Sequence, residues 1–311
     1  MTEQHASRAL RWALRFHPAA YRAEHGAELS AIYAEATQDA GSLVRLREAL
    51  DVAGHGLRQR TGLGSDRAAG QVLAHAAPLT VAVATGGSVA NLLWFFAPDG
   101  IRIPRSSSLP GVLFLANQGL MPLLWLAALA AVWTGRWSAA RALVVPATVL
   151  RLAGLPLLLL SHLFASTYAG AALNVTVPLL TGAVVLAAPR DLLGPSQPQR
   201  AAIAGTTALT VALWVALLVG AYYPLTGGPL ITHTLWAGAF AVALLFSRRD
   251  RLFAAGLAVA LLPIALQMTA SLLYPLSPAG VGALLVVLLS SAVSLLRARR
   301  RRAQVTPPSA A

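Results

Sequence analysis

Residues 111–135, GVLFLANQGLMPLLWLAALAAVWTG, contain no charged side chain; Arg136 follows them directly and Arg141 comes shortly after. A helix needs about 20 mainly apolar residues to cross the roughly 30 Å hydrocarbon core of a bilayer. Arginines beside such a run are typical of the cytosolic end of a membrane span. We therefore predict that this stretch is a transmembrane helix.

The same pattern of long apolar runs continues along the rest of the chain. It predicts an all-α fold, a polytopic transmembrane bundle of about eight spans over residues 67–302. The predicted spans lie near 71–97, 111–135, 142–161, 166–188, 201–223, 229–247, 252–274 and 279–297. Only a short turn around 162–166 separates the third run from the fourth. If that pair is re-entrant, six or seven spans remain.

The amino-acid composition favours lipid as the surrounding medium. Hydrophobic residues make up 57% of the 311 residues and charged residues only 11%, whereas a soluble domain carries about 25% charged residues. So few charges would not coat a soluble protein of this length. The absence of cysteine excludes disulfides, thiolate metal sites and cysteine nucleophiles. The Ala-, Leu- and Arg-rich, lysine-free composition is typical of a GC-rich bacterial genome.

The net charge of +13 is unevenly distributed along the chain. Residues 1–66 hold as many arginines as carboxylates, and the excess arginines flank the apolar runs. Flanking arginines serve as orientation signals in membrane proteins, so we expect no nucleic-acid partner.

The arginine positions also predict the topology. With the N-terminus inside, the inner segments hold Arg136, Arg141, Arg190, Arg200, Arg248, Arg249, Arg251, Arg297, Arg299, Arg300, Arg301 and Arg302. The outer loops hold only Arg102 and Arg105. An even number of spans returns the C-terminus to the same side. We expect a bacterial plasma (inner) membrane protein with both termini in the cytoplasm.

Residues 1–66 are predicted to form a small cytosolic domain of three helices with its linker. The helices are expected at 3–16, 18–39 and 43–60, and residues 303–311 are expected to form a disordered tail. The second helix should turn one face to the core, with Tyr21, His25, Leu29, Ile32 and Ala36. The third should do so with Leu43, Leu46, Leu50, Ala53 and Leu57.

Arg151 is the one charged residue inside a predicted span. A charge at the centre of the bilayer costs about 3 kcal/mol on insertion scales. The functional interpretation is a site for an anion or a lipid headgroup, with Pro146 and Pro156 opening the backbone to supply carbonyl partners. The alternative is that Arg151 extends to the inner interface.

Uncharged polar residues within the runs are further candidates for substrate binding. They are Asn117, Gln118, Asn174, His162, His233 and Gln267. Asn91 is a similar residue. Such side chains more often join helices by hydrogen bonds. The two histidines lack a third ligand, so no metal site is expected. The first span also carries Ala82, Gly86 and Ala90 at four-residue spacing, which fits close helix packing or simply the alanine-rich composition. A lipid-headgroup site is predicted at Arg297, Arg299, Arg300, Arg301 and Arg302.

The sequence contains no motif that carries catalysis. It has no Walker A loop, dinucleotide fingerprint, zinc-protease helix or nucleophile elbow. No carboxylate lies inside a predicted span, which lowers the expectation of proton or cation coupling. We expect no enzyme activity and no cofactor.

Residues 14–29, LRFHPAAYRAEHGAEL, resemble the short N-terminal helical module of many actinobacterial multipass membrane proteins. That pattern runs Leu-x-x-Tyr-Pro-x-x-Trp-Arg-x-x-Tyr-Gly-x-Glu-Leu. Here His17, Tyr21 and His25 replace its three aromatic residues. Genes for such proteins often lie beside PadR-type regulators. The resemblance covers about residues 8–60, implies a cytosolic module with regulatory or assembly roles, and assigns no catalytic residue.

Three functional hypotheses follow from these patterns. The first is a non-enzymatic membrane protein whose module, residues 1–60, has a regulatory role or binds a cytosolic protein partner. A homo-oligomer is left open. The second is a transporter or permease component for a small, anionic or lipid-like substrate. The third, an intramembrane enzyme acting on lipids, needs polar residues clustered at one depth.

Overall fold

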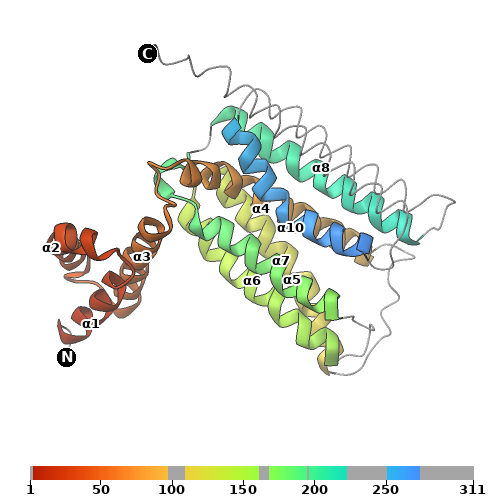
Figure 1. Cartoon of the computed structure of the whole chain (residues 1–311). Coiled ribbons are helices and arrows are strands. Elements are labelled where there is room, and N and C mark those ends of the chain that lie inside the picture. The colour runs from red at the N-terminus through yellow and green to blue at the C-terminus, as the bar shows by residue number, and fades with distance from the viewer. Residues whose placement is uncertain (1–2, 97–108, 161–167, 195, 223–250, 274–311) are drawn as a thin grey trace, which may run out of the picture.

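The computed structural model describes residues 3–96, 109–160, 168–194, 196–222 and 251–273, and within these ranges every regular element is a helix (Figure 1). Three helices at the N-terminus lie beside a bundle of longer helices. The predicted runs 229–247 and 279–297 and the tail 303–311 lie outside the described residues.

The N-terminal helices, α1 to α3, match the predicted ones within two residues at each end. They are α1 Glu3–Leu14, α2 Ala19–Thr37 and α3 Ser42–Thr61. Pro18 precedes α2 with φ −56° and ψ 147°. This extended backbone is the geometry that separates two helices. The three helices pack on one another around a small core of Ala13, Tyr33, Ala49 and Ala53.

The predicted core faces of α2 and α3 are partly wrong. Leu43, Leu46, Leu50 and Leu57 are exposed, and of the predicted α3 stripe only Ala53 is buried. On α2, Ile32 and Ala36 are exposed, whereas Tyr33 and Thr37 are buried. The reason is steric. The buried face of α3 consists of Ala49, Ala53 and Gly56, and these small side chains let α1 and its following turn approach closely.

Six longer helices and one short 3-10 helix form the bundle. They are α4 Ala68–Phe96, α5 Leu109–Trp133, α6 Trp137–Leu160, α7 Tyr168–Ala187, η1 Arg190–Leu192, α8 Gln197–Tyr222 and α10 Arg251–Leu273. They coincide with the first five predicted runs and the seventh. Two helices, over Ala68–Leu93 and Val112–Trp133, are long and apolar enough to cross a membrane, and Val175–Ala187 and Arg251–Leu266 are shorter apolar helices.

Helix α4 is the centre of the bundle and packs against α5, α7, α8 and α10. Its small residues permit this. A Cβ on Gly86 would lie 2.7 Å from the Cβ of Thr210 on α8. On α10, a Cβ on Gly256 would lie 2.6 Å from the Cβ of His75. The Thr85 hydroxyl donates to the carbonyl of Trp125 on α5 at 3.0 Å. Small residues and hydroxyls of this kind are how helices associate in lipid.

Two arginines stabilise the end of the bundle nearest the N-terminal helices. Arg141 is buried at the start of α6 and donates to the carbonyl of Ala188, which follows the last residue of α7. It thereby satisfies one of the carbonyls that a helix C-terminus leaves without a partner. Arg190 of η1 donates to Asp51 of α3 at 2.5 Å. This ion pair joins the N-terminal helices to the bundle.

Candidate functional site

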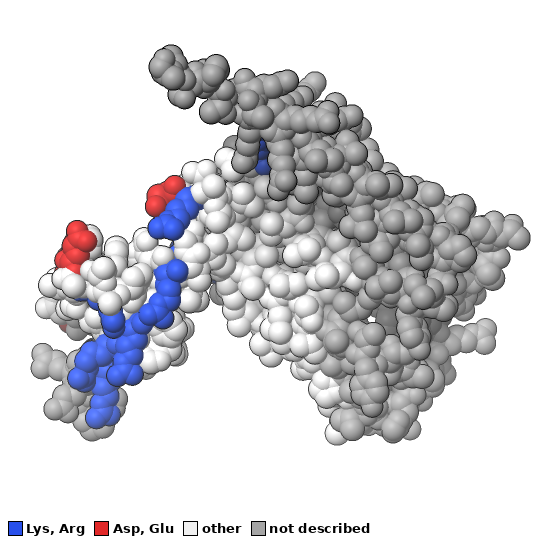
Figure 2. Space-filling view, viewed as in Figure 1, with Lys and Arg blue, Asp and Glu red and all other residues white. Residues whose placement is uncertain are grey.

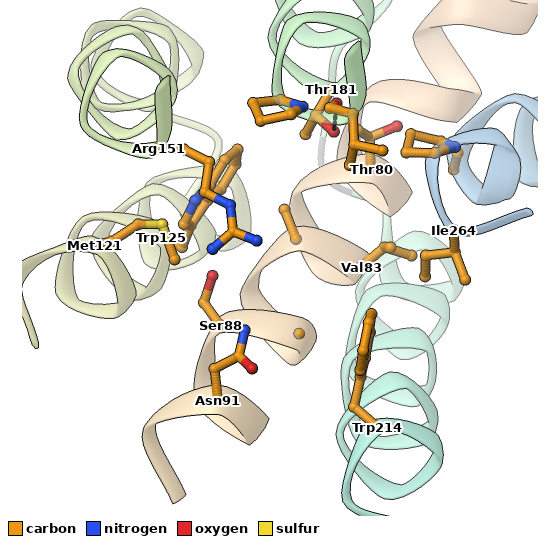
Figure 3. Close-up of a pocket in the computed structure, with 16 residues that line it drawn as sticks. Thr80, Val83, Ser88, Asn91, Met121, Trp125, Arg151, Thr181, Trp214 and Ile264 are labelled. Atoms are coloured by element: carbon orange, nitrogen blue, oxygen red, sulfur yellow. Dashed lines mark hydrogen bonds between the residues drawn. The ribbon is translucent and has the colours of Figure 1, made fainter. Parts of the chain in front are cut away.

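A cavity of about 180 Å³ lies inside the bundle, lined by side chains from α4, α5, α6, α7, α8 and α10. It is far larger than one water molecule needs. Arg151 enters it from α6. Its guanidinium points toward Ser88 and Asn91 of α4, with Trp125 of α5 beside it (Figure 3). Arg151 therefore points into this cavity between the helices.

Arg151 has no counter-charge in the described part of the chain. Its guanidinium makes no hydrogen bond or ion pair with a described residue, and none of the described helices α4 to α8 and α10 contains Asp or Glu. Helix α6 runs unbroken through Pro146 and Pro156, so the predicted opening of its backbone is not seen. A cation in this position attracts a negative charge from outside the protein.

The other polar groups of the cavity complete a set of hydrogen-bond donors. Ser88 and Asn91 make no hydrogen bond with any described residue, so the Ser88 hydroxyl and the Asn91 amide remain available. Thr80 and Thr181 already donate within their own helices, to the carbonyls of Ala76 at 2.9 Å and Val177 at 2.8 Å. These threonines are left with acceptor capacity only.

The apolar wall of the cavity is formed by aromatic and aliphatic side chains. Trp125 and Met121 come from α5, Trp214 from α8 and Ile264 from α10 (Figure 3). Such a wall lowers the local dielectric constant, and a lower dielectric constant strengthens the attraction between Arg151 and an anion. One guanidinium, one hydroxyl and one amide around an apolar cavity form a chemical environment that suits a phosphate or carboxylate group.

Of the predicted substrate-binding residues, the structure places Arg151 in this cavity and two others outside it. Asn117 is buried in the packing between α5 and α6, where its Nδ2 lies 2.7 Å from the position a Cβ would take on Gly154. Gln118 is partly exposed on α5 and does not line the cavity. The remaining predicted side chains lie outside the described ones: Asn174, His162, His233, Gln267, Arg297, Arg299, Arg300, Arg301 and Arg302.

Sequence reasoning did not assign Ser88, Trp125 and Trp214 to the site, and it favoured a packing role for Asn91. The spacing of Ser88 and Asn91, three residues apart, places both on one face of α4. This spacing could have identified Ser88 and Asn91 as a polar face of α4. Nothing local, however, relates this face to Arg151, which lies on another helix.

A second polar cluster joins the N-terminal helices. Tyr21 stacks on His25, with ring centroids 4.5 Å apart, and on His17 at 5.5 Å. The Tyr21 hydroxyl lies 3.4 Å from Nε2 of His55 on α3. His17 is completely buried, and a Cβ on Gly56 would lie 2.4 Å from its Nδ1. Within the described ranges, no group of His, Asp or Glu could hold a metal ion.

This cluster predicts that acid loosens the N-terminal helices. Burial lowers the pKa of His17 below its ordinary 6.5, and the nearby His55 lowers it further, although the Ala13 backbone opposes this. Burial, and then Arg58, lower the pKa of His55, opposed by Asp191. Lowered histidine pKa values mean that the unfolded state binds more protons. Stability is therefore full above pH 6.5 and is lost as the pH falls below it.

Hydrogen exchange of α1 to α3 in the full-length protein, corrected for intrinsic rates, should show protection decreasing from pH 7.5 to 5.5. The exchange of α4 should change less. His17→Phe, which keeps a ring against Tyr21, should reduce the pH dependence. Equal protection at both pH values in the wild-type protein would contradict the prediction.

Comparison with known proteins gives no relative: no family model, no curated protein and no solved structure matches the chain.

Proposed function

We propose that the chain is a multipass integral membrane protein whose helical bundle binds an anionic group, such as a phosphate, in the cavity at Arg151. The observation that carries this proposal is that Arg151 points into a cavity whose described lining contains no carboxylate. It favours the permease-like hypothesis, a component that recognises a small, anionic or lipid-like substrate.

The outer surface of the bundle supports the membrane setting. Large apolar side chains are exposed along α5, α6, α7 and α8, among them Leu120, Leu123, Val149, Leu179 and Leu209. Arg151, Ser88 and Asn91, by contrast, line the cavity between the helices. Soluble monomers rarely expose extended apolar surfaces, whereas lipid is the medium that such a surface requires. We propose about eight spans in a bacterial inner membrane.

The helix directions support cytosolic termini. Helices α4, α6, α8 and α10 begin, and α5 and α7 end, at the end of the bundle beside the N-terminal helices (Figure 1). The described arginines at the ends of these helices lie there too: Arg136, Arg141, Arg190, Arg200 and Arg251. The positive-inside rule assigns this end to the cytosol. The N-terminal helices then form a cytosolic module, as the resemblance implies.

The cavity supports binding more than chemistry. Ser88 is the nucleophile-type side chain nearest Arg151 in Figure 3. A serine needs a neighbouring base before it can attack. No described residue that lines the cavity is His, Asp, Glu or Lys. The proposal is therefore a non-enzymatic role.

The test is ligand-induced stabilisation of the full-length protein in a detergent with an uncharged headgroup. We expect inorganic phosphate or a short-chain phosphatidylglycerol to raise the unfolding temperature, and the two probes distinguish a soluble anion from a lipid headgroup. Arg151→Gln should abolish the shift because the amide carries no charge. Arg136→Gln, at an exposed arginine between α5 and α6, is the matched control and should keep it. An undiminished shift in Arg151→Gln would refute the proposal.

A second candidate function, regulation or assembly through residues 1–60, draws on the ion pair between Asp51 and Arg190. This contact offers a physical route from the module to the bundle. Both side chains are about 40% exposed, so the pair is worth at most about 1 kcal/mol and can be exchanged easily. A cytosolic protein that co-purifies with the full chain, and is lost when residues 1–60 are deleted, would support this role. Unchanged behaviour after the deletion would count against it.

A further inference from the structure

Helix α3 carries an apolar stripe that no other described helix covers. Leu43, Leu46, Leu50 and Leu57 are 80%, 53%, 52% and 49% exposed. Their spacing places them along one side of the helix. We call these four residues the leucine stripe. Four large apolar side chains in water are unfavourable, so the stripe calls for an apolar partner.

Arginines lie on both sides of the leucine stripe. At 100° per residue, Arg47 and Arg60 flank it, and both are exposed. Helix α1 and the turn after it add the exposed Arg8, Arg11 and Arg15. Any partner of the leucine stripe therefore has to accept positive charge at its edges.

The exposed acidic residues of the three helices gather at α2, whereas Glu48 and Asp51 are partly buried on α3 and Asp51 pairs with Arg190. Helix α2 and its following turn carry four exposed carboxylates, Glu24, Glu28, Glu35 and Asp39. Figure 2 shows arginines along α1 and α3, with one acidic group at α2 and a second beside the basic side chains nearest the bundle. Residues 1–66 are balanced in total charge, yet most exposed arginines lie on α1 and α3 and most exposed carboxylates on α2, with Arg22 on α2 as an exception.

The module is held close to the end of the bundle. Helix α3 ends at Thr61 and α4 begins at Ala68, and the six residues between them span at most about 20 Å. The Asp51–Arg190 contact adds a second connection. Under the proposed topology this end lies at the inner surface of the membrane, so the lipid headgroups are always within reach of the leucine stripe.

We propose that the leucine stripe docks on the inner leaflet of the same membrane, with its flanking arginines on anionic headgroups and α2 turned toward the cytosol. This rests on the proposed membrane embedding and not on the cavity at Arg151. A second copy of the chain fits less well. Two copies meeting through this face would bring arginines against arginines, whereas an anionic leaflet satisfies both the leucines and the arginines.

The chain contains no cysteine, so single spin labels can be placed without removing any residue. The full-length protein would carry Leu50→Cys or, as the matched control on α2, Glu28→Cys. Nanodiscs would contain either a phosphatidylglycerol mixture or phosphatidylcholine alone. In the anionic discs the label at residue 50 should be accessible to oxygen and protected from a water-soluble nickel chelate. The label at residue 28 should show the reverse.

Removing the positive charge of a flanking arginine provides a second test of membrane docking. Arg47→Gln and Arg60→Gln should each weaken docking about fivefold, as expected from the electrostatic attraction of one arginine near an anionic surface. Nickel accessibility at residue 50 equal to that at residue 28 in anionic discs would overturn the proposal. Dipolar broadening between two labels at residue 50 would overturn it in favour of a second copy. The phosphate-induced shift in unfolding temperature, measured on the same labelled proteins, reports separately on the cavity.

Discussion

Arg151→Met is expected to unfold at a higher temperature than the wild-type protein in the absence of ligand, while losing the stabilisation by phosphate. The wild-type bundle keeps a charged group in its interior without a described counter-charge. Methionine fills a similar volume without that cost. Placing an arginine at mid-membrane costs about 3 kcal/mol on insertion scales. We expect a gain of that order, measured as unfolding of the full-length protein in detergent.

A higher unfolding temperature without ligand, combined with a loss of stabilisation by phosphate, distinguishes a binding residue from a structural one. If Arg151 served mainly to stabilise the fold, its removal would lower the unfolding temperature. The matched control is Arg136→Met, at an exposed arginine, which should change stability by less than about 0.5 kcal/mol. A destabilised Arg151→Met protein would show that the arginine has a stabilising partner, and the anion site would lose its main support.

Gly86→Ala is expected to destabilise the bundle by about 1–3 kcal/mol, the usual cost of overpacking. The added Cβ would lie 2.7 Å from the Cβ of Thr210 and 2.9 Å from the carbonyl oxygen of Thr207. Backbone cannot move aside as a flexible side chain can, so α4 and α8 would have to separate. Because Ser88 and Trp214 line the cavity from these two helices, phosphate-induced stabilisation should weaken as well. Both effects are measured in one thermal-unfolding series.

Gly205→Ala is the matched control on α8, where a Cβ would meet nothing within 4 Å. Removing a glycine from an open helix position should stabilise the protein by about 0.5–1 kcal/mol. The same chemical change thus has opposite expected signs at the two sites. Equal effects of the two substitutions would show that α4 and α8 do not meet at Gly86.

The boundaries of the helices were predictable from the sequence. The predicted runs 111–135 and 201–223 correspond to α5 and α8 within a few residues. A run of apolar residues, and its end at arginine, proline or glycine, can be recognised from local sequence alone. Predicting where a helix begins and ends therefore requires no knowledge of the neighbouring helices. The same is true of α1, α2 and α3, whose breaks follow from Pro18 and Gly41.

The faces of those helices were less predictable. In α3 the leucines indicated a core that the structure assigns to Ala49, Ala53 and Gly56. Periodicity reports which side is apolar, but it does not say which apolar residues let a neighbouring helix approach. Close approach favours the smallest side chains, so the leucines remained outside.

The sequence by itself determined that long apolar helices form, where the described ones begin and end, and that Arg151 lies well inside one of them. Only the tertiary structure decided that Arg151 lines one cavity with Ser88 and Asn91 and that Asn117 does not. A helix that is apolar all round has no preferred face that a sequence pattern can reveal. Its rotation is set by contacts with other helices, and for α4 these are the close approaches at Gly86 and Gly256.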